Sequence, residues 1–270
     1  MVQINNSNFS IEQIAESGQC FRLNKIKENK YVLIAFGKYL EIIQEQEEVI
    51  FSCTADEYND IWRHYFDLNT DYNRFVESVF DADTYLYHAV QFGKGIRILK
   101  QDIWEILISF IISQQNNIKR IKKSIELLCE RFGEKKYDME GNVYFDFPSV
   151  QALAQAMQEE LDACNLGYRS RYIASTANSI LNQEVNIESV EQMDYEHAQK
   201  ELLKLCGVGN KVADCICLFA LHHLDAFPVD THIKKVIESH YPKGFPLETF
   251  LGYAGVIQQY IFYYDLKNGI

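Results

Sequence analysis

The chain has 270 residues, of which 47% are hydrophobic and 24% charged, and its formal net charge is −12. This composition indicates a globular protein of one large or two small domains and excludes a disordered or fibrous chain. No apolar run approaches the ~20 residues of a membrane span, and the first residues lack the basic and apolar segments of a secretory signal. The seven cysteines are scattered, so we expect a reduced protein without a membrane partner, in the cytoplasm or in a eukaryotic nucleus.

The first part of the chain is predicted to form a small antiparallel sheet. Two β-rich runs, residues 31–36 and 39–44, flank Gly37-Lys38 and predict a hairpin with a two-residue turn. Residues 49–53 continue the sheet, and a capping box at Thr54 predicts a helix that runs through residue 65. We therefore expect a sheet domain with a short helix over residues 1–67.

The remainder, residues 68–270, is predicted to be mainly helical. The apolar segment 103–112 indicates a buried central helix, and residues 133–147 are expected to form a loop with a short strand. Further helices are expected at 118–131, 149–162, 170–183, 191–205, 210–222, 231–239 and 247–264. The predicted fold class is α+β, with an N-terminal antiparallel sheet domain followed by a mainly α-helical domain.

The charge distribution has a local exception to the acidic average. A net negative charge argues against a nucleic-acid partner, because phosphates require Lys and Arg to meet them. Residues 118–123, however, carry four basic side chains and no acidic one. A basic patch on an acidic protein is compatible with DNA binding, which would then be strongly salt-sensitive.

A glycine-rich connection between two predicted helices is the most informative segment. Gly207 and Gly209 allow a tight turn and leave backbone N–H groups bare, which beside a helix N-terminus form a seat for phosphate. An ordinary helical hairpin with a glycine cap is the alternative. Lys211 and Cys215 are four residues apart on the second helix, so both point to the same side. Asp230, nineteen residues after Lys211, is predicted to cap the next helix.

The hairpin, its lysine and the aspartate together resemble the helix-hairpin-helix glycosylase superfamily. The hairpin region spans about residues 191–222, and the aspartate lies in the loop after it. Within that superfamily, the chain is most similar to 8-oxoguanine DNA glycosylase/AP lyase. Four further segments carry this resemblance: residues 17–22, 108–120, 166–172 and 254–262.

The resemblance implies a bifunctional repair enzyme for double-stranded DNA that contains oxidised guanine. Such an enzyme flips out 8-oxoguanine opposite cytosine and excises it through a lysine Schiff base. It then eliminates the 3′ phosphate. By resemblance Lys211 is the nucleophile, and Asp230 stabilises the positive charge that develops at the sugar. A lysine with the ordinary pKa of ~10.4 is almost entirely protonated at neutral pH. A helix N-terminus alone lowers the pKa of such an amine too little, so desolvation must lower it further.

Base recognition is implied for four residues. Gln258 reads the Watson–Crick edge of the flipped base, Phe262 stacks on one face and Cys215 covers the other. The Gly18 carbonyl accepts the N7 hydrogen that 8-oxoguanine has and guanine lacks. Core packing for Phe262 and a turn for Gly18 are the alternatives.

Contacts with DNA and with the opposite base are implied for a further set of residues. Two arginines read the orphaned cytosine, a tyrosine fills the gap, a histidine contacts phosphate, and the hairpin glycines bind the backbone. Surface salt bridges are the alternative for the arginines. Gln115 replaces an asparagine of the animal members, and its extra methylene can shift the contact with cytosine. These positions are Arg120, Arg169, Tyr168, His232, Gly207, Gly209 and Gln115.

We expect no cofactor, no catalytic metal and a monomer. The chain lacks the C-terminal four-cysteine cluster of the iron–sulfur relatives. In the family the hairpin backbone can hold a structural ion, and the corresponding positions here are Leu203, Leu205 and Val208. Two other functions are alternatives: an alkylpurine DNA glycosylase of the same fold, which works without a lysine nucleophile, and a non-catalytic DNA-binding module.

Overall fold

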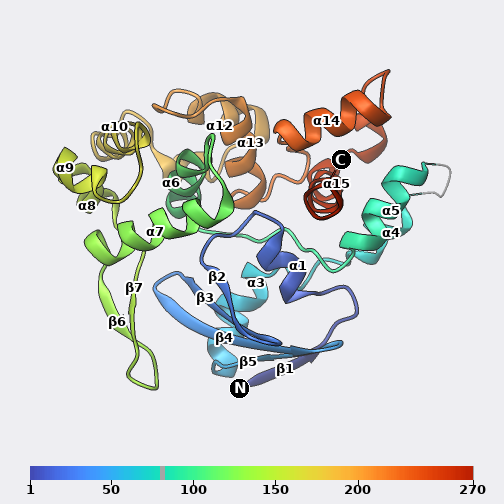
Figure 1. The fold of residues 1–270 in the computed structure, drawn as a ribbon, viewed down its shortest axis with the longest axis horizontal. Coiled ribbons are helices and arrows are strands. Elements are labelled where there is room, and N and C mark those ends of the chain that lie inside the picture. The colour runs from blue at the N-terminus through green and yellow to red at the C-terminus, as the bar shows by residue number, and fades with distance from the viewer. Residues whose placement is uncertain (80–82, 270) are drawn as a thin grey trace. The chain divides into compact units, whose positions relative to one another are not determined.

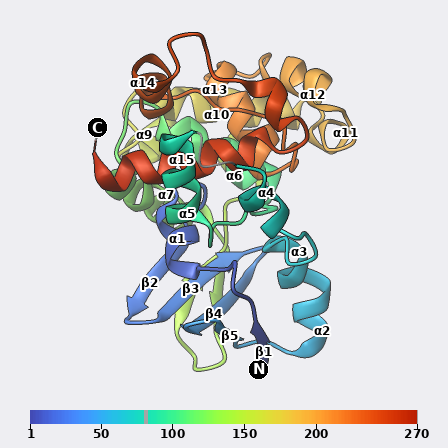
Figure 2. The ribbon, with the colours of Figure 1, turned by 90° about the vertical axis from the view of Figure 1, so that its right-hand side faces the viewer.

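Five antiparallel strands form the N-terminal sheet (Figures 1 and 2). Their order in space is β1-β5-β4-β3-β2, and the strands are β1 (Val2–Asn5), β2 (Leu23–Lys27), β3 (Lys30–Ala35), β4 (Lys38–Glu45) and β5 (Glu48–Phe51). Phe36 and Gly37 form the turn between β3 and β4 with φ of 51° and 70°, as a type I′ hairpin turn requires. The predicted hairpin is confirmed, but its turn lies one residue earlier because Phe36 leaves the strand.

A helical segment after the sheet packs on its apolar side. It consists of α2 (Ala55–Glu57), a π-helical turn (Tyr58–Trp62) and α3 (Arg63–Tyr65), which Figure 2 shows beside the sheet. The Thr54 hydroxyl accepts the Glu57 N–H at 3.1 Å, which confirms the predicted cap. The Phe51 ring of β5 lies 5.6 Å from that of Phe66. Leu40 and Ile42 of β4 are fully buried as well.

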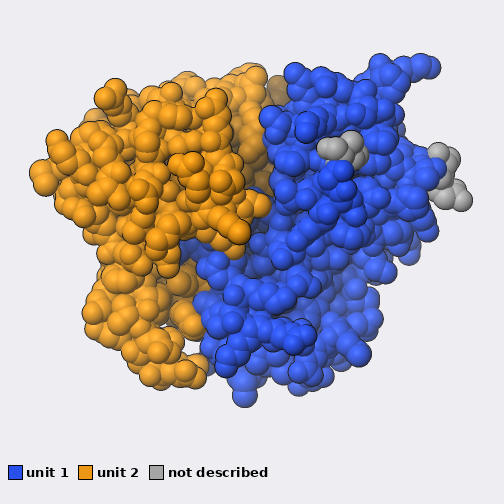
Figure 3. Space-filling model, viewed as in Figure 1, with its two compact units in different colours: residues 1–32, 40–100, 222–270 blue, residues 33–39, 101–221 orange. Residues whose placement is uncertain are grey.

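The structure is a computed structural model that describes residues 1–79 and 83–269. It divides into two compact units (Figure 3): unit 1 comprises residues 1–32, 40–100 and 222–270, and unit 2 comprises residues 33–39 and 101–221. The units are defined by contacts, and the predicted domain boundary at residue 67 stays a prediction. The predicted α+β class, a sheet followed by a mainly helical part, is confirmed. Among the described residues, we find no helix long and apolar enough to cross a membrane.

Unit 1 adds helices from both ends of the chain to the sheet. They are α1 (Ile11–Glu16), α4 (Asn73–Glu77), α5 (Thr84–Gly93), α14 (Thr231–His240), a 3-10 helix (Leu247–Phe250) and α15 (Ala254–Asn268). α15 packs against α5 and α14. The single helix predicted for residues 247–264 is therefore wrong. Gly252, with φ of 87°, separates the 3-10 helix from α15.

A buried carboxylate joins three segments of unit 1. Asp67 accepts a hydrogen bond from the Tyr72 hydroxyl, and its oxygens lie 3.0 Å from Lys100 Nζ and 3.2 Å from His222 Nε2. Burial opposes the charged form of Asp67. The contacts with His222 and Lys100 outweigh that effect and hold its pKa well below the usual range. Arg97 also donates to the Asp67 carbonyl at 3.0 Å, so the cluster links residues 66–72, 97–100 and 222.

Unit 2 is built around helix α6. Its elements are α6 (Ile103–Ser113), α7 (Ile118–Phe132), β6 (Lys135–Tyr137), β7 (Val143–Phe145), α8 (Val150–Ala154), α9 (Gln158–Asp162), α10 (Arg169–Leu181), α11 (Ile187–Val190), α12 (Tyr195–Leu202) and α13 (Asn210–Phe219). Almost every residue of α6 is buried, which confirms the predicted central helix. It packs on α7, α10 and α13, and so it is the support for the hairpin between α12 and α13.

Two local predictions for unit 2 are corrected. Residues 133–147 contain a complete antiparallel pair, β6 and β7, instead of one short strand. The Tyr144 hydroxyl of β7 donates to the Gly37 carbonyl at 3.1 Å, which explains why the tip of the β3–β4 hairpin belongs to unit 2. The helix predicted for 149–162 is two helices. Met157 is extended, and its N–H donates to the Glu160 carboxylate at 3.3 Å, which starts α9 anew.

Candidate active site

Different structural features account for glycine at the two hairpin positions, 207 and 209. Gly207 has φ of 81°, and a Cβ there would lie 2.7 Å from the Tyr172 ring, so the fold itself requires glycine. Gly209 is the N-cap of α13, and a Cβ there would meet nothing within 4 Å. The fold therefore does not need glycine at residue 209. Its missing side chain leaves the N-terminus of α13 open, which favours access by an anion.

Two polar side chains that the sequence did not single out hold the hairpin in place. Gln114, at the end of α6, donates from Nε2 to the Gly207 carbonyl at 2.8 Å. Thr176 of α10 donates from its hydroxyl to the Cys206 carbonyl at 2.8 Å. Both side chains bind main-chain oxygens, so neither of them occupies an N–H group of the hairpin. Gln114 could have been suspected from its place beside Gln115, whereas nothing in the local pattern marks Thr176.

Lys211 lies in the first turn of α13, as predicted, and is half-buried. Its Nζ is 4.9 Å from the centroid of the Phe110 ring, which stacks on Phe219 at 5.6 Å and 15°. Cys215 follows one turn after Lys211 and is buried. The amine therefore borders the aromatic surface of Phe110 in unit 2. Sequence reasoning did not identify Phe110 as a neighbour of Lys211.

Asp230 caps α14, as predicted. Its Oδ1 accepts the Ile233 N–H at 2.9 Å, and the residue is extended at the helix start. The cap bond fixes the orientation of the carboxylate, while the side chain is only half-buried. Asp230 belongs to unit 1 and Lys211 to unit 2.

Gln258 carries a buried oxygen that lacks a hydrogen-bond donor. The side chain is 4% exposed on α15, and its Nε2 donates to the Pro228 carbonyl at 3.1 Å. Because that carbonyl can only accept, it sets which end of the amide is nitrogen. Oε1 is then left without a partner among the described residues. A buried unsatisfied acceptor costs about 1–3 kcal/mol, so its presence points to a ligand with a hydrogen-bond donor.

Phe262 and Gly18 lie together in unit 1. A Cβ on Gly18, whose φ is 74°, would lie 3.1 Å from Phe262 Cε1. Phe262 is partly exposed, although Ile261 and Tyr263 beside it on α15 are buried. The core alternative for Phe262 therefore does not hold. Gln259, which the sequence did not indicate, donates from Nε2 to the Ser17 carbonyl at 2.5 Å and holds this turn on α15.

His232 is oriented by a carboxylate. Its Nδ1 lies 2.5 Å from Oδ2 of Asp265, which is 2% exposed, and its ring meets Phe262 edge-on at 5.6 Å. Asp265 was also missed, because it lies 33 residues from its partner along the chain. Since the carboxylate engages Nδ1, Nε2 is the ring nitrogen that remains for another partner.

The predicted readers of the opposite base have different environments. Arg169 is 7% exposed, and its guanidinium donates to three main-chain carbonyls, those of Gln114, Gln115 and Leu166. The salt-bridge alternative is therefore wrong for Arg169. Gln115 itself has φ of 47°. Arg120 is exposed on α7, and Tyr168 is 46% exposed.

The hairpin positions proposed for a structural ion offer main-chain oxygens. Among them, the Leu205 carbonyl accepts the Val208 N–H at 3.1 Å and keeps a second lone pair. Carbonyl oxygens are hard donors that suit a monovalent or calcium ion, so the donor set of Leu203, Leu205 and Val208 fits, and the ion stays a prediction. No cluster of three His, Cys, Asp or Glu side chains within residues 1–79 and 83–269 is arranged for a metal.

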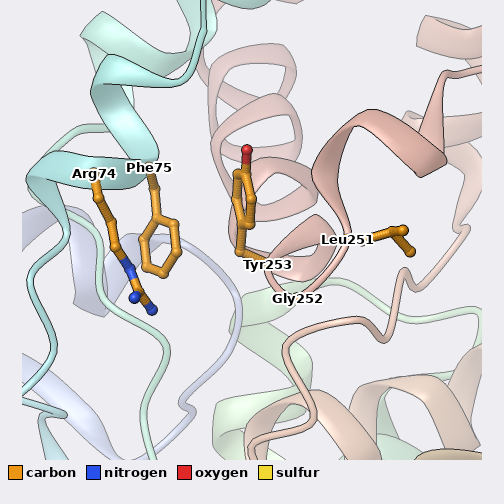
Figure 4. A pocket seen from close by; sticks show the side chains of 5 residues that line it. All are labelled: Arg74, Phe75, Leu251, Gly252 and Tyr253. Carbon is orange, nitrogen blue, oxygen red and sulfur yellow. The ribbon is translucent and has the colours of Figure 1, made fainter.

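One pocket of unit 1 lies away from these residues, at the start of α15 (Figure 4). Its volume is about 330 Å³, and its walls are Arg74, Phe75, Leu251, Gly252 and Tyr253. The Arg74 guanidinium lies 4.6 Å from the Phe75 ring centre, and Phe75 stacks on Tyr253 at 5.0 Å. None of the predicted site residues lines this pocket.

Comparison with known proteins identifies the family. Residues 1–107 match the N-terminal domain of 8-oxoguanine DNA glycosylase, and residues 108–243 match the HhH-GPD superfamily of base excision DNA repair proteins. The chain belongs to the 8-oxoguanine DNA glycosylase family. The N-glycosylase/DNA lyase of Saccharomyces cerevisiae is 31% identical over 267 residues, covering 88% of this chain and 70% of that protein.

Two further relatives of this glycosylase family agree. A probable N-glycosylase/DNA lyase of Methanothermobacter thermautotrophicus is 30% identical, over 76% of this chain and 74% of its own length. The Clostridium acetobutylicum 8-oxoguanine glycosylase/lyase, solved with double-stranded DNA that contains cytosine opposite 8-oxoguanine, superimposes with a TM-score of 0.92. It is 36% identical, covering 100% of this chain and 99% of that one.

Proposed function

We propose that this protein is a bifunctional DNA glycosylase and AP lyase that excises 8-oxoguanine opposite cytosine from double-stranded DNA. Gln258 Oε1, which has no partner in the part of the chain that the structure describes, carries the proposal, because an oxidised guanine presents N–H donors on its Watson–Crick edge. Phe262 lies on the same helix one turn further, with part of its ring exposed for stacking on a flipped base. Family membership supports the same activity.

Lys211 is the nucleophile in this proposal. Its neutral amine attacks C1′ of the flipped nucleotide, and the C1′–N9 bond breaks with its electron pair passing to the base, which takes up a proton. The nitrogen then loses a proton, and the C1′–O4′ bond breaks with its electron pair passing to O4′, which takes up a proton. A C1′=N Schiff base forms. Loss of a proton from C2′ expels the 3′ phosphate by β-elimination. Water hydrolyses the imine and returns the free lysine.

Asp230 stabilises the positive charge that develops at the sugar while the base departs. Its cap bond to Ile233 supports this role, because a carboxylate held at a helix start needs little reorganisation during the reaction. A fixed anion is effective only when it is oriented before the charge appears. The capping and catalytic roles of Asp230 are therefore compatible.

Selection of the oxidised base rests on Gly18. 8-Oxoguanine has a hydrogen on N7, and the Gly18 carbonyl accepts it, whereas guanine would present a lone pair to that carbonyl. The positive φ of Gly18 and its contact with Phe262 support a turn that only glycine tolerates. Cys215 covers the second face of the base.

The DNA backbone and the opposite cytosine are bound by the remaining predicted residues. The open N-terminus of α13 at Gly209 and Nε2 of His232, whose other ring nitrogen engages Asp265, are suited to phosphate. Exposed Tyr168 is suited to fill the gap that the flipped base leaves, and exposed Arg120 to read cytosine. The protein acts as a monomer on cytoplasmic or nuclear DNA in this proposal.

Borohydride trapping on a duplex with 8-oxoguanine opposite cytosine tests the proposal. The wild type and Lys204→Gln should form a covalent adduct, because Lys204 is exposed and paired with Glu201 at 2.5 Å. Lys211→Gln should bind the duplex without being trapped. Equal trapping of Lys211→Gln would overturn the assigned nucleophile. Tight binding by the wild type without any trapping would overturn the lyase activity.

A further inference from the structure

We infer that Phe110 is a positioning residue for Lys211. The face of the Phe110 ring holds the resting lysine as an ammonium ion, and this contact sets how alkaline the medium must be for the amine to attack. This inference rests on the proposed function, since it concerns the nucleophile of that reaction. Lys211 Nζ lies 4.9 Å from the Phe110 ring centroid, within the range of a cation–π contact. The two residues are 101 positions apart in the chain, and the packing of α6 on α13 brings them together.

The surroundings strengthen the contact. Phe110 is 3% exposed and Phe219 is 4% exposed, so the stacked pair is shielded from water. Lys211, Cys215 and Phe219 follow one another at intervals of four along α13, which places them on one stripe of the helix. The ammonium thus lies at the accessible end of an otherwise apolar stripe. A cation over an aromatic face is worth more where water is excluded.

The other charged groups of the packed helices lie on α13, α6 and α12. On α13, Asp214 is the neighbouring acid, and burial raises its pKa against the hydrogen bonds from Tyr195 and Gln199 of α12. On α6 the only charged residue is Glu105, five positions before Phe110. The remaining titratable groups of these elements are Asp102 at the start of α6, Cys215 and Cys217 on α13, and Glu196, His197, Lys200 and Glu201 on α12.

The contact acts on one protonation state only. The negative face of an aromatic ring attracts the ammonium ion and has little attraction for the neutral amine. Phe110 therefore stabilises the form of Lys211 that cannot attack, and it places that form at a defined position. The lysine must give up a proton and leave the ring before it bonds to C1′.

Fluorinated phenylalanines at residue 110 separate this effect from packing, because fluorine removes the negative ring face while the ring keeps its shape. The single-turnover rate of borohydride trapping on an abasic duplex is measured from weakly acidic to alkaline pH. With pentafluorophenylalanine, the midpoint of the profile should move about 0.4–0.7 unit toward acid, which makes trapping about two- to five-fold faster on the rising part. The alkaline plateau should be unchanged, and fewer fluorines should give smaller shifts.

The same substitutions at Phe219 are the matched control, because that ring is equally buried in the same stack. They should leave the midpoint in place. An unshifted midpoint at residue 110, equal shifts at both rings, or a lower alkaline plateau would each overturn the inference. Failure of the proposed function is a distinct result, because the wild type itself would then show no trapping at any pH.

Discussion

Replacement of Arg169 by alanine should destabilise the protein far more than replacement of Arg120. The Arg169 guanidinium donates from Nε to the Gln114 carbonyl at 2.8 Å, from Nη1 to Leu166 at 3.1 Å and from Nη2 to Gln115 at 3.1 Å. A hydrogen bond from a charged donor contributes about 1.5–3 kcal/mol. Water can reach the carbonyls of the partly exposed loop at 114–115 after the substitution, so the net loss is expected near 3–4 kcal/mol.

Urea unfolding followed by circular dichroism measures this loss. With a slope of about 3 kcal/mol per molar, the midpoint for Arg169→Ala should fall by roughly 1 M. Arg169→Lys should fall by less, since an ammonium still reaches some of the carbonyls. Arg120→Ala, at an exposed position of α7, should change the free energy of unfolding by at most about 0.5 kcal/mol. Equal destabilisation by the two alanine variants would refute the assignment of Arg169 as the buried clamp of this loop.

The same pair of variants separates stability from opposite-base selectivity. Both should lower the preference for cytosine over adenine opposite the lesion. Arg120 should do so by loss of a direct contact, and Arg169 by release of the loop that carries Gln115. Overall affinity for the lesion should change less than selectivity. Unchanged selectivity for both variants would remove them from the opposite-base site.

Four further outcomes are expected. Gln258→Ala should reduce 8-oxoguanine excision more than abasic-site nicking, because in the proposed complex its amide contacts the base and no other part of the DNA. Equal loss in gel assays of both steps would contradict this role. Gly18→Ala should also impair excision and lower the free energy of unfolding, measured in urea, by about 1–2 kcal/mol. Alanine is strained at positive φ, and its Cβ would lie 3.1 Å from Phe262 Cε1. Wild-type excision would argue against that contact. The folded-state pKa of Asp67 is lowered from an unfolded value of ~3.9, so its contribution to stability is present above that pH and lost as pH falls below it. Asp67→Asn should therefore have a lower free energy of unfolding at neutral pH, and that free energy should fall less steeply toward acid than in the wild type. A curve of unfolding free energy against pH parallel to that of the wild type would exclude the carboxylate as the cause. Lys119→Gln, in the exposed basic turn of α7, should reduce the slope of log affinity against log salt by about 0.9 if Lys119 contacts one phosphate; an unchanged slope would show that it contacts none.

Predictions from the sequence succeeded where the responsible contacts are local. The cap of α14 by Asp230, the cap at Thr54 and the place of Lys211 in the first turn of α13 depend on bonds across three or four residues. The two β-rich runs on either side of Gly37-Lys38 likewise predicted the β3–β4 hairpin. Errors arose where a single backbone angle decides the outcome, as at Phe36 in the turn and Gly252 before α15.

Contacts between distant segments could not be inferred in this way. Nothing near Lys211 in the chain indicates the Phe110 ring, and nothing near His232 indicates Asp265. Arg169, for which the sequence offered a contact with cytosine or a surface salt bridge, is instead buried against carbonyls that include those of Gln114 and Gln115, 55 and 54 residues away. Each of these partners is selected by helix packing, which depends on the whole set of buried side chains.

The chain alone therefore determined the α+β class, the helical hairpin, its lysine and the capping aspartate, since each is written in short-range spacing. Only the tertiary structure decided which buried groups lack a partner, which cation rests on a ring and which arginine is a clamp. Spacing along a helix or strand is set by backbone geometry over a few residues, whereas the partner of a side chain is set by long-range packing and by the exclusion of water from the core.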